Sequence, residues 1–163
     1  MKIGILSDTH NNIETTVKAV DKFKELGVEL VLHAGDITSP KMLGLFKGLF
    51  CKFVLGNGDI DTEALNEESG KLGFGAIEES CEIEAGGKKI ILFHGNDVSQ
   101  FRQAVASGKY DYVIKGHTHI FENYVSSNTR VINPGSLYGA DEFSIAVLQT
   151  GTGRVEMIRI YAD

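Results

Sequence analysis

The sequence of 163 residues has little cysteine and no long apolar run. Its two cysteines, Cys51 and Cys81, are far apart and form no CxxC pair, which favours two reduced thiols in a cytoplasmic protein. No stretch reaches the roughly 18 apolar residues that a membrane-spanning helix requires. The first apolar run ends in Ser7 and Asp8, so we interpret it as part of the fold rather than as a signal peptide.

An excess of positive charge is also missing, since the formal net charge is −6 at pH 7. This balance argues against a general affinity for nucleic acid. It does not exclude a phosphate-bearing substrate, because bound metal ions would reverse the local field. The sequence has no repeat, linker or low-complexity segment. Its length and its apolar fraction of 42% are those of one globular domain, which we expect to span residues 1–163.

The first half of the chain alternates short apolar runs with segments of helical periodicity. We expect strands at residues 2–6, 30–32 and 52–55, and helices at 13–26 and 40–49. This alternation of strands and helices predicts right-handed crossovers and a parallel sheet. In such sheets, functional groups gather beyond the carboxyl ends of the strands.

The second half predicts more antiparallel strands. A helix at 61–69 and an irregular connection at 71–77 precede a hairpin of 81–85 and 88–93, and Ser99 is expected to cap a helix that ends near residue 107. Further strands are expected at 112–115, 121–125, 130–132, 143–148 and 155–160. The predicted fold class is therefore α/β, with a parallel first half.

Candidate metal ligands follow the predicted strands directly. They are Asp8, His10, Asp36, Asn57, His94, His117 and His119. In an extended backbone, residues two apart point to the same side, so Asp8 with His10, and His117 with His119, each present two ligands together. The set is more than one ion can use. Oxygen and nitrogen ligands without thiolate suit Mn²⁺, Fe²⁺, Ni²⁺, Co²⁺ or Zn²⁺ in a catalytic role, and two such ions form a clamp for in-line attack on phosphorus.

Five ordered motifs resemble those of the calcineurin-like metallophosphoesterase superfamily. They are Asp8-x-His10, Gly35-Asp36, Gly56-Asn57-Gly58-Asp59, His94-Gly95 and Gly116-His117-Thr118-His119. The short length and Asn133-Pro134-Gly135-Ser136 resemble the small single-domain phosphodiesterase branch of that superfamily. The resemblance implies a four-layer αββα sandwich of two mixed β-sheets with flanking helices.

The resemblance also implies the chemistry of the site. Asp8, His10, Asp36 and His119 would hold one divalent ion, and Asp36, Asn57, His94 and His117 would hold the other, with Asp36 bridging. We expect Mn²⁺ first, with Ni²⁺, Fe²⁺, Co²⁺ and Zn²⁺ as alternatives. A metal-bridging hydroxide would attack the phosphorus of a small phosphate ester, a phosphodiester in particular. Asp36 and Asn57 are the expected catalytic residues, and Asn57 would stabilise the developing charge.

The chain departs from the family pattern at three positions. Gly58 stands where many relatives have a histidine proposed to protonate the leaving group, which indicates reliance on metal electrostatics and good leaving groups. Asn96 replaces a second histidine, and Asn11 replaces a frequent glycine, so both are expected to reshape the substrate pocket. The expected substrate-binding residues are Asn57, Asn11 and Asn133.

Several assignments stay open at this point. His33 is assigned either to packing or to support of a ligand, and Asp59 either orients a neighbour or caps a loop. The segment 133–136 either lines the site or makes a tight turn. The alternative function is a non-catalytic scaffold, because the fold also resembles a retromer scaffold subunit with a degraded metal site. His10, which that scaffold lacks, favours an enzyme. Relatives often form dimers, which leaves a homodimer open.

Overall fold

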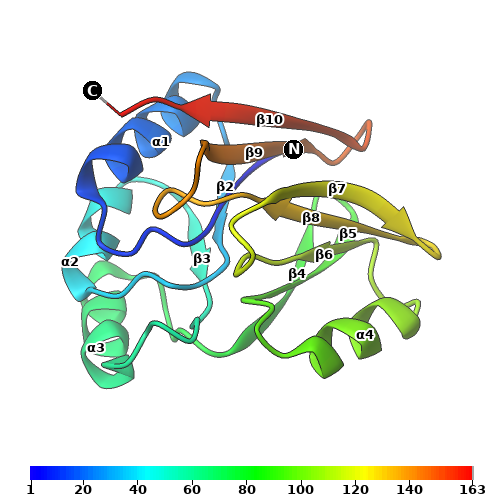
Figure 1. The fold of residues 1–163 in the computed structure, drawn as a ribbon, viewed down its shortest axis with the longest axis horizontal. Coiled ribbons are helices and arrows are strands. Elements are labelled where there is room, and N and C mark those ends of the chain that lie inside the picture. Colours follow the sequence, from blue (N-terminus) through cyan, green and yellow to red (C-terminus); the bar gives the residue numbers. More distant parts are fainter. Residues whose placement is uncertain (163) are drawn as a thin grey trace.

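A computed structural model describes residues 1–162, in which ten strands form two five-stranded sheets (Figure 1). The first sheet consists, in spatial order, of β10 (Arg154–Ile160), β9 (Phe143–Gln149), β1 (Lys2–Leu6), β2 (Leu30–His33) and β3 (Cys51–Phe53). The second consists of β4 (Ser80–Ala85), β5 (Lys88–Phe93), β6 (Tyr112–Ile114), β8 (Thr129–Pro134) and β7 (Phe121–Ser126).

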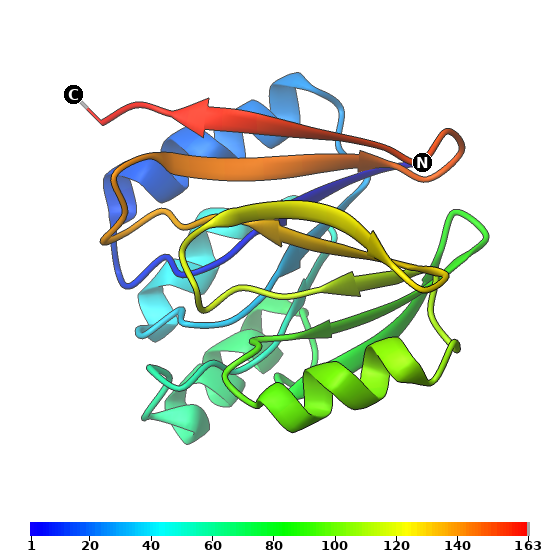
Figure 2. The same cartoon turned by 45° about the vertical axis from the view of Figure 1, so that its right-hand side comes forward.

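Helices cover the outer faces of both sheets (Figures 1 and 2). The first sheet carries α1 (Ile13–Glu25), α2 (Pro40–Leu43), the 3₁₀-helix η1 (Gly44–Phe46) and α3 (Thr62–Leu72), and the second carries α4 (Val98–Ala106). The four-layer αββα arrangement is thus confirmed. Within the described residues, no helix combines the length and apolar character that crossing a membrane would need.

Both sheets are mixed. β1 pairs with β2 and β2 with β3 in parallel, as the alternation in the first half predicts, and β5–β6 and β6–β8 are parallel in the second sheet. The pairs β4–β5, β7–β8 and β9–β10 are antiparallel hairpins. β9 returns to the first sheet and lies antiparallel to β1.

Three apolar layers hold the four structural layers together. Because successive side chains of a strand point to opposite faces, Ile3 and Ile5 of β1 face the second sheet, whereas Leu6 packs under α1 to α3. In the same way, Ile90 of β5 belongs to the layer between the sheets, and Ile91 packs against α4. Each sheet therefore has buried side chains on both faces, whereas the side chains of the edge strands β7 and β10 are mostly exposed or half-buried.

The second helix is shorter than the predicted range of 40–49. α2 ends at Leu43, η1 adds one further turn, and the backbone leaves the helix at Lys47, with φ −52° and ψ 133°. Gly48 then adopts a left-handed φ of +85°, which suits glycine and stops a helix. Leu49 still packs against the core without being helical.

The start of α4 is also corrected. Its N-cap is Asp97 rather than Ser99, because the Asp97 carboxylate accepts hydrogen bonds from the backbone N–H groups of Ser99 and Gln100, at 2.8 and 3.1 Å. α3 begins after Asp61 as predicted but continues to Leu72, and Gly73 ends it with a φ of +79°. The sequence pattern predicted these helices but placed their ends one to three residues away from the observed ones.

Candidate metal centre

The loops after β1, β2, β5 and β6 meet at one side of the molecule. The Asp8 N–H donates to the Gly35 carbonyl at 3.0 Å, which joins the first two loops. His94, at the end of β5, joins the two sheets, because its Nδ1–H donates to the carbonyl of Ala34 at 2.7 Å. The parallel strands therefore bring their carboxyl ends together across both sheets, as the sequence predicts.

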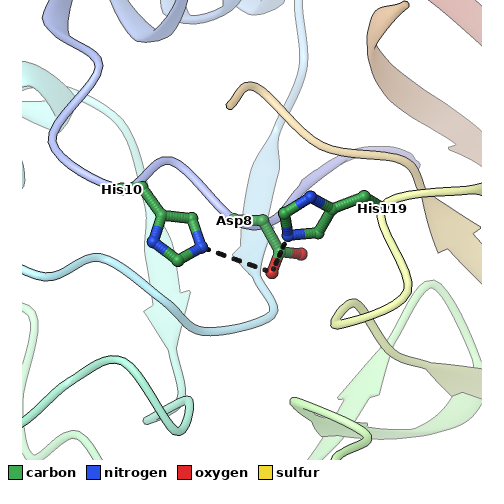
Figure 3. A group of neighbouring side chains, drawn as sticks. All are labelled: Asp8, His10 and His119. Atoms are coloured by element: carbon green, nitrogen blue, oxygen red, sulfur yellow. Dashed lines mark ion pairs between the residues drawn. The ribbon is translucent and has the colours of Figure 1, made fainter. Parts of the chain in front are cut away.

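Asp8, His10 and His119 form the first group of neighbouring ligand atoms (Figure 3). Asp8 Oδ1 lies 3.2 Å from His119 Nε2 and 3.9 Å from His10 Nε2. The three ligand atoms are within 4.8 Å of one another, and the Asp8 side chain is completely buried. One carboxylate oxygen thus faces two imidazole nitrogens that come from different sheets.

Asp8, Asp36 and His94 form the second group. His94 Nε2 lies 3.5 Å from Asp36 Oδ2 and 4.0 Å from Asp8 Oδ1, and all three side chains are buried. His10 Nε2 is 3.2 Å from the same Asp36 oxygen. Both carboxylates therefore lie between His10 and His94, and Asp8 is common to the two groups.

Hydrogen bonds at the Nδ1 atoms of His94 and His119 show how these two rings are oriented. A carbonyl oxygen only accepts, so His94 carries its proton on Nδ1, and His119 likewise donates from Nδ1 to the Gly139 carbonyl at 3.3 Å. In the neutral form of each ring, the Nε2 lone pair consequently faces a carboxylate oxygen. Lone pair against carboxylate is repulsive unless a cation lies between them, and such ring orientation is typical of metal-ligating histidines.

Three atoms of the cluster are buried and lack a hydrogen-bond partner among residues 1–162. They are Asp8 Oδ1, His10 Nε2 and His94 Nε2. Buried polar atoms nearly always have a hydrogen-bond partner, so three unpaired atoms at one place indicate that they bind a ligand. All three are atoms that bind divalent transition metals. The residues present therefore fit a metal centre.

The ligand loops do not have the extended backbone that the sequence pattern predicts for residues 8–10 and 117–119. Asp8, His10, Asp36, His117 and His119 all have φ between +39° and +71°, a region that residues with a side chain rarely adopt. Each such residue costs on the order of 1–3 kcal/mol. This strain is concentrated at the predicted ligands, which is typical of a functional site whose geometry the surrounding structure imposes.

Asp59 holds the loop that carries Asp36. Its buried carboxylate accepts hydrogen bonds from the backbone N–H groups of Asp36 at 3.0 Å, Thr38 at 2.6 Å and Gly56 at 2.8 Å. Burial raises the pKa of Asp59, and the hydrogen bonds from Gly56 and Thr38 counteract that rise. The structure therefore shows that Asp59 orients its neighbours, the first of the two roles predicted for it.

His33 supports the loop that carries Asp36 through hydrogen bonds to Gly35 and Thr9. Its Nδ1 accepts from the Gly35 N–H and its Nε2 contacts Thr9 Oγ1, both at 3.2 Å, while the Thr9 hydroxyl donates to the Asp36 carbonyl at 3.3 Å. Complete burial, with smaller effects of nearby histidines, lowers the pKa of His33 to about 3. His33 is therefore a neutral imidazole that both packs in the core and supports a candidate ligand.

Asn133 holds the loop that carries His117 and His119. Its buried amide donates to the Gly116 carbonyl at 2.8 Å and to Thr118 Oγ1 at 3.0 Å, and its oxygen accepts from the Gly135 N–H at 3.0 Å. The His117 N–H in turn donates to Asp8 Oδ2 at 3.1 Å. Asn133 is thus occupied with positioning this loop, and substrate contact by Asn133 stays a prediction.

The remaining predicted site residues are exposed and lie in loops that follow strands. The ring of His117 contacts the ring of His94, with centroids 5.1 Å apart, and its side chain is exposed. Asn57, Asn11 and Asn96 are also exposed. Gly58 stands where many relatives have a histidine. Its backbone N–H donates to Oδ1 of the candidate ligand Asp36 at 2.6 Å.

Two residues of this region were not predicted individually. The Ser136 hydroxyl donates to the Asp8 carbonyl at 3.1 Å, after a turn in which Gly135 has a φ of +87°. The Tyr138 ring contacts the His10 ring, with centroids 4.9 Å apart. The motif 133–136 marked the segment that contains Ser136, whereas no signal in the sequence marked Tyr138.

Sequence comparison relates the chain to phosphoesterases. The calcineurin-like phosphoesterase superfamily domain matches residues 1–153. Phosphodiesterase MJ0936 of Methanocaldococcus jannaschii is 35% identical over 150 residues, which cover 85% of this chain and 86% of that protein. A probable metallophosphoesterase of Methanothermobacter thermautotrophicus is 32% identical over 145 residues, with 83% and 77% covered.

Structural comparison agrees with the sequence comparison. The structure of an archaeal phosphodiesterase superposes with a TM-score of 0.93 at 32% identity, and covers 98% of this chain and 100% of that chain. Vps29 of Entamoeba histolytica in complex with zinc superposes with a TM-score of 0.68 over 98% of both chains. Its identity is only 18%, so this second likeness shows the fold alone.

Proposed function

The chain belongs to the calcineurin-like phosphoesterase superfamily, and from this premise we propose that it hydrolyses small phosphate esters, phosphodiesters in particular, with two divalent metal ions. The observation that carries the proposal is the cluster of two buried carboxylates whose oxygens face the Nε2 atoms of His10, His94 and His119. Such a cluster needs a cation, and cations at the ends of two sheets attract an anionic phosphate.

The proposed ligand sets follow the family motifs. Asp8, His10, Asp36 and His119 would hold one ion, and Asp36, Asn57, His94 and His117 the other. Asp8 also lies close to His94, which leaves it available to support the second ion. Mn²⁺ is the ion to test first, because the carboxylate and amide oxygens of the set suit it and the thiols Cys51 and Cys81 lie outside the set.

When bound, the two ions supply Lewis-acid activation of the attacking water and neutralise charge on the phosphoryl oxygens. The chain contributes orientation. Asp36 is fixed by the Gly58 N–H and by the Asp59 carboxylate, which holds the Asp36 backbone. Asn57, which is exposed, would bind a phosphoryl oxygen through its amide, and Asn11, also exposed, is the second proposed substrate contact.

Gly58 limits the acid–base chemistry that the chain supplies. Without a side chain at this position, the proposed enzyme protonates the leaving group from water rather than from a histidine, and therefore favours esters of acidic alcohols. The non-catalytic scaffold is less well supported, because the complete ligand set, including His10, is retained and three of its atoms have no hydrogen-bond partner among residues 1–162.

The proposal is tested with metal-stripped protein resupplied with Mn²⁺, Ni²⁺ or Mg²⁺. Hydrolysis of bis(p-nitrophenyl) phosphate and of p-nitrophenyl phosphate would be compared for the wild type, Asp36→Ala and His94→Ala. We expect metal-dependent diester turnover and a loss on the order of a thousandfold in both variants. Asp21→Ala, which removes an exposed aspartate of α1, is the matched control and should keep full activity. A wild-type protein that binds two ions and hydrolyses neither ester would favour the scaffold.

A further inference from the structure

Tyr138 is a partly exposed aromatic residue placed directly against the metal centre. Its ring lies 4.9 Å from the ring of His10 between centroids, at an interplanar angle of 36°, and 49% of the residue is exposed. One part of the ring is thus covered by a candidate ligand, and another part remains open to a ligand from solution.

The backbone that carries Tyr138 is fixed on both sides. The Tyr138 N–H donates to Ser136 Oγ at 3.0 Å, and the same hydroxyl reaches the carbonyl of Asp8. The preceding Leu137 carbonyl accepts from Asn12 Nδ2 at 3.0 Å and from Thr15 Oγ1 at 2.8 Å, at the start of α1. Because the loop is already ordered, contact with a ligand would cost the ring little conformational entropy.

A cavity of about 490 Å³ begins beside this loop. Gly139, the residue after Tyr138, lines it together with the candidate ligand His119. Much of the remaining wall is apolar, from Ile120, Phe121 and Met157. Two acidic side chains, Asp141 and Glu142, also line the cavity, so it disfavours a second anionic group.

A second cavity, of about 410 Å³, lies on the Asn57 side of the centre and differs in chemistry. Its wall consists largely of polar side chains, including Asn96, Gln100, Glu79 and Asp97. An apolar planar group would leave these amides and carboxylates without partners. The side of Tyr138 and His119 is therefore the one suited to such a group.

We propose that Tyr138 determines substrate specificity by stacking on a planar, uncharged substituent of the phosphate ester. The proposal rests on the proposed function, because it places the phosphate at the metal centre. A flat aromatic group can lie offset or edge-on to the exposed part of the phenol ring, whereas a saturated ring of the same size cannot. The substrate class is then aryl or nucleobase-bearing phosphate esters rather than purely aliphatic ones.

Two phosphonates test this proposal without being consumed, because their carbon–phosphorus bond is not hydrolysed. Phenylphosphonate and cyclohexylphosphonate have similar size, and differ in whether the ring is planar. Their dissociation constants would be measured by titration calorimetry on Mn²⁺-loaded protein, at a pH at which both carry two negative charges. We expect the wild type to bind phenylphosphonate about fivefold more tightly. Tyr138→Phe should keep this preference, and Tyr138→Leu and Tyr138→Met should lose it.

The outcomes separate this proposal from the proposed function. Equal affinity of the two phosphonates for the wild type, or a preference that survives in Tyr138→Leu and Tyr138→Met, would overturn the role of Tyr138 while leaving the phosphate site intact. Loss of the preference in Tyr138→Phe would also overturn it, because the hydroxyl rather than the ring would then be responsible. Binding of neither phosphonate would contradict both proposals. The manganese content of each variant is measured alongside, so that a lost ion is not mistaken for lost stacking.

Discussion

Asp59, in the loop after β3 of the first sheet, and Asn133, in β8 of the second, hold the two halves of the candidate metal centre with opposite hydrogen-bonding groups. Asp59 accepts from three backbone N–H groups around Asp36. Asn133 donates to a carbonyl and a hydroxyl of the loop that carries His117 and His119, and accepts one N–H. Neither side chain belongs to the groups of neighbouring ligand atoms, yet each fixes the backbone of a ligand loop.

The difference reflects what each loop carries. The first sheet supplies the carboxylates, which are buried, since Asp8 is fully covered and Asp36 is 3% exposed. A buried charge requires fixed donors around it, and backbone N–H groups supply them. The second sheet supplies imidazoles, and His117 is exposed. An imidazole that binds a metal through its lone pair needs orientation more than compensation of a buried negative charge, so an amide suffices.

Asp59→Asn should give the largest effect on this arrangement. The variant keeps the volume of the side chain but turns an NH₂ group toward backbone N–H donors, leaving at least one unpaired. We expect the free energy of unfolding of the metal-free protein to fall by about 4 kcal/mol, and metal affinity to fall about 10- to 100-fold. Urea unfolding and metal titration measure the two effects.

The matched control is Asp61→Asn, because Asp61 is an exposed N-cap that accepts one N–H, from Ala64 at 3.0 Å. Asparagine caps helices as well as aspartate does, so this change should alter stability by only a few tenths of a kcal/mol. Similar losses in the two variants would show that Asp59 does not hold the ligand loop.

Asn133→Asp makes the reverse exchange in the second sheet and should have the next largest effect. A carboxylate oxygen would then face the Gly116 carbonyl, at a position where the amide now donates over 2.8 Å. We expect a loss of about 3 kcal/mol at pH 8. The loss should shrink at pH 5, where a protonated carboxyl again offers a donor. Chemical unfolding at both pH values checks this, and a loss that does not depend on pH would contradict the assigned donor role.

His33, in β2 of the first sheet, makes the free energy of unfolding depend on pH. Burial lowers its pKa to about 3 in the folded protein, whereas the unfolded chain titrates near the ordinary value of 6.5. Between these values the unfolded state binds more protons, so this contribution to stability is complete above pH 6.5 and is lost as the pH falls. At pH 5 the loss amounts to about 2 kcal/mol.

His33→Gln, which does not titrate, removes this component. The difference in unfolding free energy between the wild type and the variant should therefore decrease as the pH falls from 7 to 5, in metal-free protein. A difference that stays constant over this range would mean that His33 is protonated in the folded protein as readily as in the unfolded one.

Gly58→Ala should produce the smallest of these effects. A Cβ at this position would lie 3.0 Å from Asp36 Oδ1 and 3.1 Å from its Cγ, so a candidate ligand would have to shift by a few tenths of an ångström. We expect about 1 kcal/mol of lost stability and about tenfold weaker metal binding. Gly70→Ala, in α3 with open space around it, should instead stabilise the protein by roughly the same amount. Thermal unfolding and metal titration of both variants would show whether the signs are opposite.

The sequence was sufficient to predict that candidate ligands follow the strands, but not the way they are held. Asp8 and Asp36 each follow an apolar run of the parallel first half, and the rule that parallel strands present their carboxyl ends together predicts that they meet. That His94 of the second sheet joins them came from the resemblance. The four layers came from the resemblance to a family. The end of α2 at Leu43 was not predicted, because η1 and Gly48 interrupt an apolar pattern that continues to Leu49.

The missing information concerns partners that are distant in the sequence. Nothing near Asn133 indicates that its amide reaches Gly116, and nothing near Tyr138 indicates that its ring lies on His10. The left-handed φ values of Asp8 and Asp36 were not predictable either, because this conformation is uncommon for any residue with a side chain, even though aspartate adopts it more often than most. Tertiary contacts impose such conformations.

The candidate ligands are divided between the two sheets, so the candidate metal centre forms only when both sheets are in place. Asp8 and His119 lie far apart in the chain and meet only after the sheets have closed over the apolar layer that contains Ile5 and Ile90. The unfolded chain therefore offers no site, and metal binding should favour the native state by mass action. Bound ions would link residues of the two sheets after the sheets have packed together. Their uptake would report, in a refolding experiment, the moment at which the two halves of the molecule come together.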